Sequence, residues 1–568
     1  MKNLFGIVLA CILSVSVQAA PRYVELKPMD QLVNVPVGKV SANANILPII
    51  TWGGDIATIY ANGSQRNTAA GSIFASHGLN YKLVREDVYA NQVKNYLAGK
   101  TPFLRGTLGM INSAVDLLAK NPATRPVVFY QMTWSAGGDA LVVKNSIKKV
   151  KDLKGKTIAL QAYGPHMDYL ARILGDANLT VNDVNIKWLP DLTGTDNSPM
   201  AALYEANVDA AFVIIPDALA LTSGGNIGTG AEDSVKGARI LISTKTANRV
   251  IADVYAVRQD YYQANQAKVH ELAKALMEAE EGLNKLITNR SSMSSQYKKT
   301  MTAAAEILLD SPEALADTEG LYADCEFVHF TGNVDFFTNN NYPRRMEKMS
   351  SEINAGLKQF GLIKGNQKLA KASINYKQLK TSLGATTQSD QSRFNRDEVS
   401  KLVNRKQQQN SLEEGELFSF DVFFKPNQTS FSAELYKDDF AKVVDLAATY
   451  GGAIISVEGH SDPMGYLRAK KKHSPSVVLG RIKQSARNLS LGRAQAVRDE
   501  IISYASAKGI SMDTAQFATV GHGISQPSTG ICGSDPCAPK TQDEWHSNMR
   551  VKFRIIQVEA ESEVFMPL

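Results

Sequence analysis

A polar stretch from Thr386 to Glu416 divides the chain into two parts. It is rich in Gln, Ser, Asn and charged side chains and poor in large apolar ones. Because such a stretch buries little apolar surface, it predicts a linker over residues 384–416, with a short helix near Asp397–Lys406. The 568 residues also exceed the size at which one hydrophobic core stops growing, about 250–300 residues. We therefore expect a folded unit on each side of the linker.

The first nineteen residues predict export. Lys2 precedes an apolar run, Leu4–Val17, that is too short for a membrane span, and small residues follow it. Cleavage is expected after Ala19, leaving residues 1–19 as a signal peptide. The alternative, a lipoprotein signal ending at Cys11, fits poorly because the apolar run continues past that residue. No later window reaches the ~18–20 apolar residues that cross a bilayer.

Composition narrows the class of protein further. Hydrophobic residues make up 44% of the chain and charged residues 21%, which are ordinary values for a globular protein. The formal net charge of +6 is small for this length and comes with no dense Lys/Arg block. We therefore expect no nucleic-acid partner.

Three cysteines remain after export. Cys532 and Cys537 lie five residues apart in a loop rich in Gly and Pro. In an oxidising compartment this spacing predicts a disulfide. A zinc half-site is the alternative, but no second Cys or His pair lies nearby, so we expect no metal and no cofactor. Cys325 stands among apolar side chains and is expected to be a buried free thiol.

Short apolar strands alternate with amphipathic helices between residues 20 and 383, which is the pattern of an α/β unit. The expected strands are Ile46–Trp52, Tyr81–Val84, Val127–Met132, Thr157–Ala162, Ile186–Leu189 and Ala210–Ile215. The expected helices include Ile56–His77, Ala90–Leu97, Pro165–Leu174, Ser198–Glu205, Asp217–Thr222, a long helix over residues 260–287, Ser292–Leu308, Asn341–Phe360 and Tyr376–Leu383.

A second pattern covers residues 417–558 and is followed by a short tail, residues 559–568. Alternating apolar residues from Phe418, a helix over 433–450, a strand over 453–458, a helix over 490–508 and strands over 516–520 and 550–558 give the order β-α-β-α-β-β. Such a unit forms one sheet covered by helices on one face, an α+β fold.

Four blocks in this second unit resemble the OmpA-like peptidoglycan-binding domain. They are Val457–Asp462, Asn488–Val497, Val520–Gly523 with Pro527, and Asn548–Val551. They occur in the family's order across the whole unit. The resemblance implies a periplasmic protein associated with peptidoglycan, close to the outer membrane.

The chemistry of the ligand suits two residues of these blocks. The diaminopimelate of the peptidoglycan stem ends in an ammonium and a carboxylate. By resemblance Asp462 binds the ammonium and Arg493 the carboxylate, which a guanidinium can grip with two parallel hydrogen bonds; Asn548 and Arg550 line or brace the site. The alternative is an Asp–Arg pair that only ties strand to helix.

The second unit departs from the family's pattern in two places. Ala486 stands where the family usually has Asn. An insert with a basic segment from Lys470 to Lys483 separates Asp462 from Arg493. A solvated basic loop is the favoured interpretation of this segment, and contact with anionic wall polymer or lipid headgroups is the alternative.

The first unit resembles type II periplasmic solute-binding proteins of the nitrate, alkanesulfonate and thiamine-precursor subgroup. Val150–Leu160 followed by Tyr163-Gly164-Pro165, and Val208–Val213 followed by Pro216, carry the resemblance. It implies two α/β lobes that close on a small solute, with contacts from loops where strands end and helices begin. The candidate ligand-binding residues are Trp52, Gly53, Gly54, Asp55, Thr133, Trp134, Ser135, Tyr163, Gly164, His166, Pro216 and Asp217.

Structural roles compete with ligand binding at several of these positions. Trp52 and Trp134 would also serve as interlobe core, His166 as an ordinary helix-start residue, and Asp55 as a helix cap. The mixed lining fits a zwitterion or a small anion equally.

An enzyme is not expected. Pyrimidine synthases of the same architecture carry a Cys cluster, whereas Cys325 is the only Cys of this unit, and no catalytic motif is present. The sequence therefore predicts a solute-binding protein anchored on peptidoglycan that serves an inner-membrane importer or another partner. The alternative is an envelope assembly scaffold whose solute-binding fold serves protein interaction.

Overall fold

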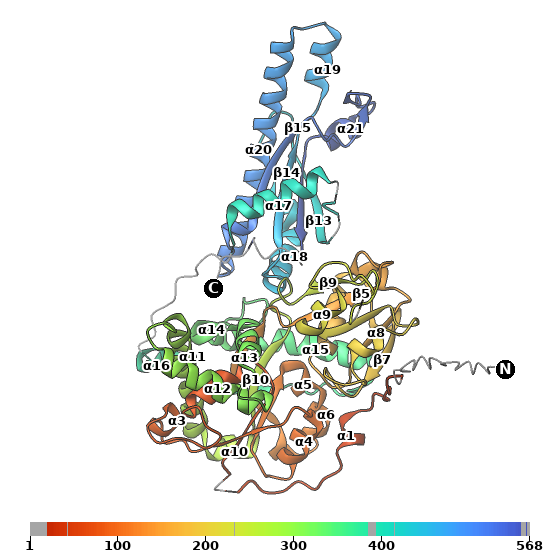
Figure 1. The fold of residues 1–568 in the computed structure, drawn as a ribbon. Helices are drawn as coiled ribbons and strands as arrows, with labels where there is room; N and C mark the ends of the chain where they lie inside the picture. The colour runs from red at the N-terminus through yellow and green to blue at the C-terminus, as the bar shows by residue number, and fades with distance from the viewer. Residues whose placement is uncertain are drawn as a thin grey trace, which may run out of the picture.

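A computed structural model of the chain shows two folded units joined end to end (Figure 1). It describes residues 20–41, 44–231, 233–383, 394–409, 411–413, 415–557 and 564. The predicted signal peptide, the first part of the predicted linker and nearly all of the predicted tail lie outside these residues. No helix in the described ranges is long and apolar enough to cross a bilayer.

The first lobe contains a parallel β1–β2 pair and a mixed sheet with the order β11-β4-β10-β3, in which β12 also pairs with β4. Its early elements are α1 (Met29–Leu32), β1 (Ile46–Ile49), α2 (Asp55–Ala61), α3 (Ile73–Ser76), β2 (Lys82–Arg85), α4 (Tyr89–Leu97), β3 (Phe103–Thr107), α5 (Leu108–Ser113), α6 (Val115–Leu118) and β4 (Pro126–Ser135). The chain later returns with β10 (Ala252–Arg258), α10 (Gln259–Ala264), α11 (Gln266–Thr288), α12 (Ser294–Leu309), α13 (Leu315–Ala323), β11 (Cys325–Phe327), α14 (His329–Thr338), α15 (Met346–Gln359), β12 (Ala370–Lys371) and α16 (Tyr376–Leu383).

The second lobe is one five-stranded sheet with the order β7-β6-β8-β5-β9. Its elements are β5 (Asp139–Val143), β6 (Thr157–Gln161), α7 (His166–Asp176), β7 (Asn185–Leu189), α8 (Pro199–Leu203), β8 (Ala210–Ile214), α9 (Ile215–Leu221) and β9 (Arg239–Ser243). The chain crosses between the lobes twice, from β4 to β5 and from β9 to β10. The predicted two-lobed α/β fold is therefore confirmed.

Two predicted helices of this unit are wrong in extent. The helix expected over Ile56–His77 is two helices, α2 and α3, because Gly63 and Ser64 adopt left-handed conformations with φ of 81° and 61°. The helix expected over 260–287 is divided between α10 and α11 at Asn265. The sequence pattern also missed six strands of this unit: β3, β5, β9, β10, β11 and β12.

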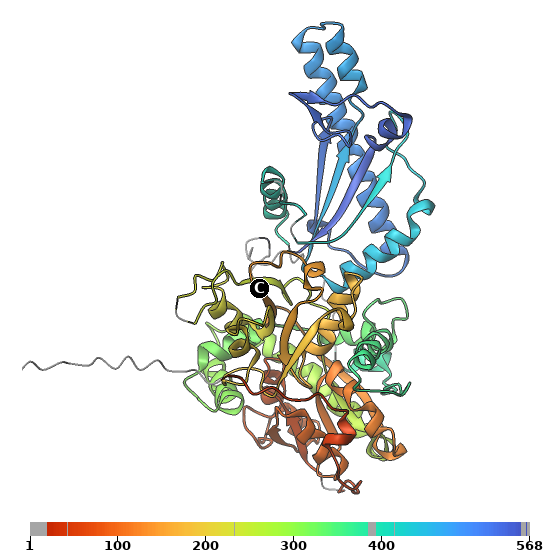
Figure 2. The same cartoon turned by 90° about the vertical axis from the view of Figure 1, so that its right-hand side faces the viewer.

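The second unit has the predicted β-α-β-α-β-β order, with the sheet order β13-β18-β14-β15 and a parallel β14–β15 pair (Figure 2). Its elements are α17 (Arg396–Gln408), β13 (Glu416–Phe423), α18 (Lys437–Thr449), β14 (Ile454–His460), α19 (Met464–Lys471), α20 (Ser476–Ala507), β15 (Phe517–Gly523), β16 (Ile531–Cys532), β17 (Asp535–Pro536), α21 (Gln542–Ser547) and β18 (Arg550–Ile556).

Three features of this unit differ from the prediction or extend it. The short helix expected in the linker is present as α17, but it packs on the sheet, with Leu402 beside Ile454 and Ile556 in one buried cluster. Because Ile455 and Ile555 belong to the core on the other face, helices cover both faces of the sheet rather than one. The basic insert is not a loop, since it forms α19 and the first turns of α20.

The cysteine predictions are confirmed. Cys532 and Cys537 form a disulfide that closes the β16–β17 hairpin. Cys325 is a buried free thiol, and burial raises its pKa well above the usual value. The part of the chain that the structure describes contains no group of three or more His, Cys, Asp or Glu side chains arranged to hold a metal ion.

Candidate functional site

Asp55, at the start of α2, is fully buried in a charge network of the first lobe. Its carboxylate lies 2.9 Å from a guanidinium nitrogen of Arg105 on β3, which also contacts Asp253 on β10 at 2.8 Å. Burial raises the pKa of Asp55 to about 7 despite the neighbouring cation, and it raises the pKa of Asp253 as well. Asp55 therefore neutralises Arg105 rather than pointing at solvent.

Other parts of the chain pack directly against the two glycines before Asp55, so these glycines do not face an open cleft. A Cβ on Gly53 would lie 1.9 Å from the carbonyl oxygen of Leu321 in α13, and one on Gly54 would lie 2.7 Å from the Met132 sulfur. The missing side chain at Gly53 thus lets the end of α13 pack directly on the first lobe.

Trp52 lies between the lobes and is partly exposed. Its indole nitrogen donates to the Thr133 hydroxyl at 3.1 Å, and the ring rests on the backbone of Gly138. Asp324, which follows α13, contacts the same glycine, and burial raises its pKa to about 7. Trp52, Thr133 and Asp324 are brought together at this edge of the interlobe boundary.

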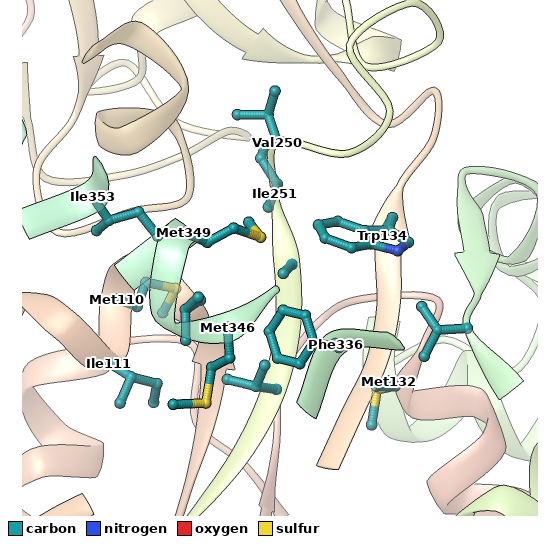
Figure 3. Packing of buried hydrophobic residues seen from close by; sticks show 14 of the residues in the cluster. Met110, Ile111, Met132, Trp134, Val250, Ile251, Phe336, Met346, Met349 and Ile353 are labelled. Atoms are coloured by element: carbon teal, nitrogen blue, oxygen red, sulfur yellow. The ribbon is translucent and has the colours of Figure 1, made fainter. Parts of the chain in front are cut away.

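Trp134 belongs to an apolar core between the lobes (Figure 3). Its ring packs edge-on against Phe336 of α14 at a centroid distance of 6.1 Å. The cluster combines Met110 and Met132 from the first lobe with Val250 and Ile251 from the second crossover. Met346, Met349 and Ile353 of α15 complete it. The chain's own helices therefore fill the space around Trp134.

Ser135 and His166 meet at the first crossover. The Ser135 hydroxyl donates to Asp139 at 2.6 Å, and His166 Nε2 lies 2.7 Å from the other oxygen of the same carboxylate. His166 stacks on Phe212 at 5.5 Å, and all four side chains are buried. This polar group joins the crossover to α7 inside the protein.

Tyr163 and Gly164 contact other parts of the chain. The Tyr163 hydroxyl donates to the carbonyl of Lys27 and accepts from its N–H, both at 2.8 Å. A Cβ on Gly164 would lie 2.1 Å from the side-chain oxygen of Gln161. The segment before α1 therefore occupies the polar end of Tyr163.

Pro216 and Asp217 lie apart from the other candidates, at the start of α9. Pro216 is exposed, and Asp217 accepts a hydrogen bond from Thr193 at 3.0 Å. Partial burial raises the pKa of Asp217. The predicted cleft residues are thus divided among the Asp55 charge network, the Trp52 edge, the apolar core around Trp134, the buried crossover, the contact of Tyr163 with Lys27, and the start of α9.

Sequence reasoning missed Asp168, which lies where the two lobes touch. Asp168 is 5% exposed, and its Oδ1 has no hydrogen-bond partner. A Cβ on Gly109 of α5 would lie 2.4 Å from that oxygen, so the carboxyl group of α7 abuts the other lobe. Burial raises the pKa of Asp168 to about 7. Asp168 could have been identified from the sequence by its position, since it lies two residues after His166 in the same first turn of α7.

The two best-defined cavities lie outside this boundary. One of about 220 Å³ is lined by residues that include Ile46, Gln92 and Phe103, and one of about 110 Å³ is lined by residues that include Pro28 and Leu362. None of the predicted ligand-binding residues lines either cavity.

Arg493 occupies an unusual position in the second unit. It is 1% exposed, and its guanidinium donates to the carbonyl oxygens of Gln428, His460 and Lys425 at 2.8, 3.0 and 3.1 Å. The guanidinium also lies 5.2 Å from the centroid of the Phe424 ring. Burial lowers the pKa of Arg493 to about 10, although the nearby Asp462 opposes this shift.

Asp462 follows β14 and is half-buried. One carboxylate oxygen accepts from the N–H of Met464 at 3.1 Å, and the other is buried without a partner. Burial raises its pKa, while the neighbouring Trp545 side chain of α21 opposes the rise. Within the described residues, no ion pair within 4 Å joins Asp462 to Arg493.

Asn548 and Arg550 contact residues of their own surroundings. Asn548 is fully buried and exchanges hydrogen bonds with Thr529 at 3.3 Å. Arg550 donates to the carbonyl of Ser547 at 3.1 Å and lies 3.8 Å from Asp421. The sequence reasoning missed Trp545. It lies three residues before Asn548, and its being a tryptophan so close to that motif could have identified it.

Comparison with known proteins bears on part of the chain. Residues 72–285 match a protein-family model described as NMT1/THI5 like, which is less than half of the 568 residues. No curated protein matches the chain.

Three solved structures show the range of similar folds. The alkanesulfonate-binding protein SsuA from Xanthomonas axonopodis pv. citri bound to MOPS is 16% identical, with 57% of this chain and 96% of that chain covered and a TM-score of 0.37. The periplasmic aliphatic sulphonate binding protein SsuA from Escherichia coli is 17% identical, with 59% and 98% covered and a TM-score of 0.39. The desulfurization enzyme DSZB is 17% identical, with 60% and 99% covered and a TM-score of 0.36. Similarity at this level assigns neither a ligand nor an activity. Residues 72–285 are thus similar to the NMT1/THI5 like family, and they lie within a two-lobed unit that extends beyond the match at both ends.

Proposed function

We propose that the chain is an exported periplasmic protein that its C-terminal, OmpA-like unit anchors on peptidoglycan. The observation that carries this proposal is the environment of Arg493, a buried guanidinium that is bonded to three carbonyl oxygens and to no carboxylate of the described residues. Asp462 beside it keeps one oxygen without a partner. A ligand with one carboxylate and one ammonium, such as the free end of diaminopimelate, would satisfy both groups.

Sedimentation of the full-length chain with insoluble peptidoglycan tests the anchor. Asp462→Asn and Arg493→Lys should each weaken binding by about thirtyfold or more, because each leaves a ligand charge poorly paired at a cost of about 2–5 kcal/mol. Asp543→Asn changes an exposed carboxylate on α21 and serves as the matched control. If both site variants sediment as the unchanged chain does, the assignment is wrong.

The proposal for the two-lobed unit is capture of a small solute for an inner-membrane importer or another partner. The two crossovers and the NMT1/THI5-like match support it. Among the candidate residues Pro216 is exposed, and Trp52, Tyr163 and Asp217 are partly exposed. The solute would therefore enter when the lobes separate. It would contact these partly exposed residues first and the buried crossover residues Ser135 and His166 afterwards.

A screen for solutes tests capture. Amino acids, sulfonates, pyrimidines and small anions are added to the full chain, and a ligand should shift tryptophan emission and raise the melting temperature with ln(1 + [L]/Kd). Trp52→Ala should remove the emission change. Absence of a thermal shift across the whole screen would reject solute capture.

The packing between the lobes favours a second function, an envelope assembly scaffold. Trp134, Met346 and Met349 fill the interlobe boundary with apolar side chains. A unit that never opens would offer a rigid surface to protein partners instead of a cleft. Mass spectrometry of small molecules released from the purified protein distinguishes the two functions, since a scaffold releases none in stoichiometric amount.

A further inference from the structure

Residues 463–498 form a strongly basic segment. Most of its cations have no role in the functions proposed above. The segment contains nine Lys or Arg residues and no Asp or Glu. Only Arg493 among these cations belongs to the proposed peptidoglycan site. A stretch this long without any acidic residue creates a field of one sign, which attracts anions.

The basic segment projects from the sheet as a helical hairpin. α19 and α20 run side by side beyond the ends of the strands, at the end of the molecule farthest from the two-lobed unit (Figures 1 and 2). The buried residues of α20 begin only at Ser490. Its first fourteen residues, Ser476–Leu489, therefore extend for about 21 Å without entering a core.

Specific contacts hold the hairpin in place. Tyr466 of α19 donates its hydroxyl to Asp535 at 3.1 Å, and Lys470 pairs with the same carboxylate. The ammonium of Lys483 on α20 lies 4.8 Å from the centroid of the Tyr466 ring. None of these contacts involves Lys471, Lys472 or Arg481.

The tip combines unpaired cations with exposed apolar side chains. Lys471, Lys472 and Arg481 have no ion-pair partner within 4 Å among the described residues. Val477 and Val478, in the first turn of α20, are 64% and 39% exposed. A helical element can bind a membrane interface by burying apolar side chains while its Lys and Arg side chains attract anionic lipids.

We propose that the tip of the α19–α20 hairpin docks on the phosphate headgroups of an anionic lipid bilayer. Lys471, Lys472 and Arg481 would contact the phosphates, and Val477 and Val478 would enter the boundary between headgroups and acyl chains. Peptidoglycan also offers anions, but it has no apolar phase in which the two valines could be buried. The valines therefore favour a lipid surface over the wall.

Sedimentation with vesicles tests the proposal on the full-length chain. Binding is expected to vesicles of phosphatidylglycerol and phosphatidylethanolamine, to fall with added salt, and to be absent with phosphatidylcholine alone. The triple variant Lys471→Glu, Lys472→Glu, Arg481→Glu should bind at least about 100-fold more weakly, since each basic residue near the surface contributes about fivefold. Lys298→Glu, Lys299→Glu, Lys377→Glu, three exposed cations of the two-lobed unit, form the matched control.

A second pair of changes separates charge from apolar contact. Val477→Ser with Val478→Ser should weaken vesicle binding while leaving its salt dependence unchanged. Equal binding to neutral and anionic vesicles, or wild-type binding by the triple variant, would overturn the proposal. A triple variant that loses peptidoglycan sedimentation but keeps vesicle binding would show that the wall is the occupant. Because Asp462 and Arg493 are unchanged in these variants, failure of the peptidoglycan anchor would be seen separately.

Discussion

Asp168 is a buried carboxyl group that faces the other lobe and has no ion-pair partner within 4 Å among the residues that the structure describes, and its ionisation is coupled to stability. Its pKa is raised from 3.8 to about 7, mainly by burial. The folded state therefore binds the proton more tightly than the unfolded state does. The resulting stabilisation is fully present below pH ~4, is lost as the pH rises to about 7, and amounts to at most about 4 kcal/mol.

We expect Asp168→Asn to flatten this pH dependence. The amide cannot ionise, so the variant should lose less free energy of unfolding between pH 5 and pH 8 than the unchanged chain. Urea unfolding at the two pH values measures this difference. Asp196→Asn, an exposed carboxylate on the second lobe, is the control. A pH dependence equal to that of the unchanged chain would show that Asp168 is already ionised when folded.

At the residue scale, the sequence identified the chemical groups better than their environments. Asp462 and Arg493 could be named from motif position, yet the three carbonyl oxygens around Arg493 come from Lys425, Gln428 and His460, which lie 68, 65 and 33 residues before it. No local pattern predicts such convergence. The burial of Trp134 could not be predicted locally either, because the helices that cover it, α14 and α15, lie some two hundred residues later in the chain.

At the scale of elements, α17 tests where the second unit begins. Leu402 is buried against the sheet face that α18 and α20 leave open. Leu402→Ala should lower the free energy of unfolding of this unit by about 2–5 kcal/mol, because it removes a buried side chain and leaves a cavity. Asn404→Ala, on the exposed side of the same helix, should change it by less than about 0.5 kcal/mol. Denaturant unfolding followed by circular dichroism measures both; equal effects would place α17 outside the core.

The disulfide between Cys532 and Cys537 allows a second prediction at this scale. It closes a short loop, so the chain-entropy model assigns it only about 2 kcal/mol. Cys532→Ser with Cys537→Ser should leave the sheet folded while loosening the β16–β17 hairpin that carries Asp535. Hydrogen exchange should rise at residues 530–537 and in α19, whose Tyr466 and Lys470 contact Asp535. Global unfolding of the unit would contradict this expectation.

The element pattern explains which parts of the fold the sequence could predict. Buried strands with continuous apolar runs, such as β6 and β8, were found, whereas β3 was missed because the buried Arg105 interrupts its apolar run. α20 was predicted from Ser490 onward, where its buried face begins. Its earlier turns have no buried face, so the helical period that marks an amphipathic helix is absent there.

At the scale of the whole molecule, the second unit docks on the crossover between the lobes. The N–H of Arg249 donates to the carbonyl of Thr449, and the N–H of Gly452 donates to the carbonyl of Thr246, both at 3.1 Å. Asp445 of α18 bridges Arg172 of the second lobe and Lys348 of α15. The second unit therefore rests on the segment that must bend if the lobes open.

Gly452 provides the sharpest test of this docking. A Cβ at Gly452 would lie 1.9 Å from the carbonyl oxygen of Lys245, so Gly452→Ala cannot be accommodated while the two backbones remain in contact. We expect the variant to keep both units folded but to separate them, and small-angle X-ray scattering should show a larger radius of gyration. Gly480→Ala is the matched control, since its Cβ meets no atom within 4 Å. An unchanged scattering profile for Gly452→Ala would mean that the units do not dock through this loop in solution. If the profile changes and solute affinity changes with it, wall anchoring and lobe movement are coupled through the second crossover.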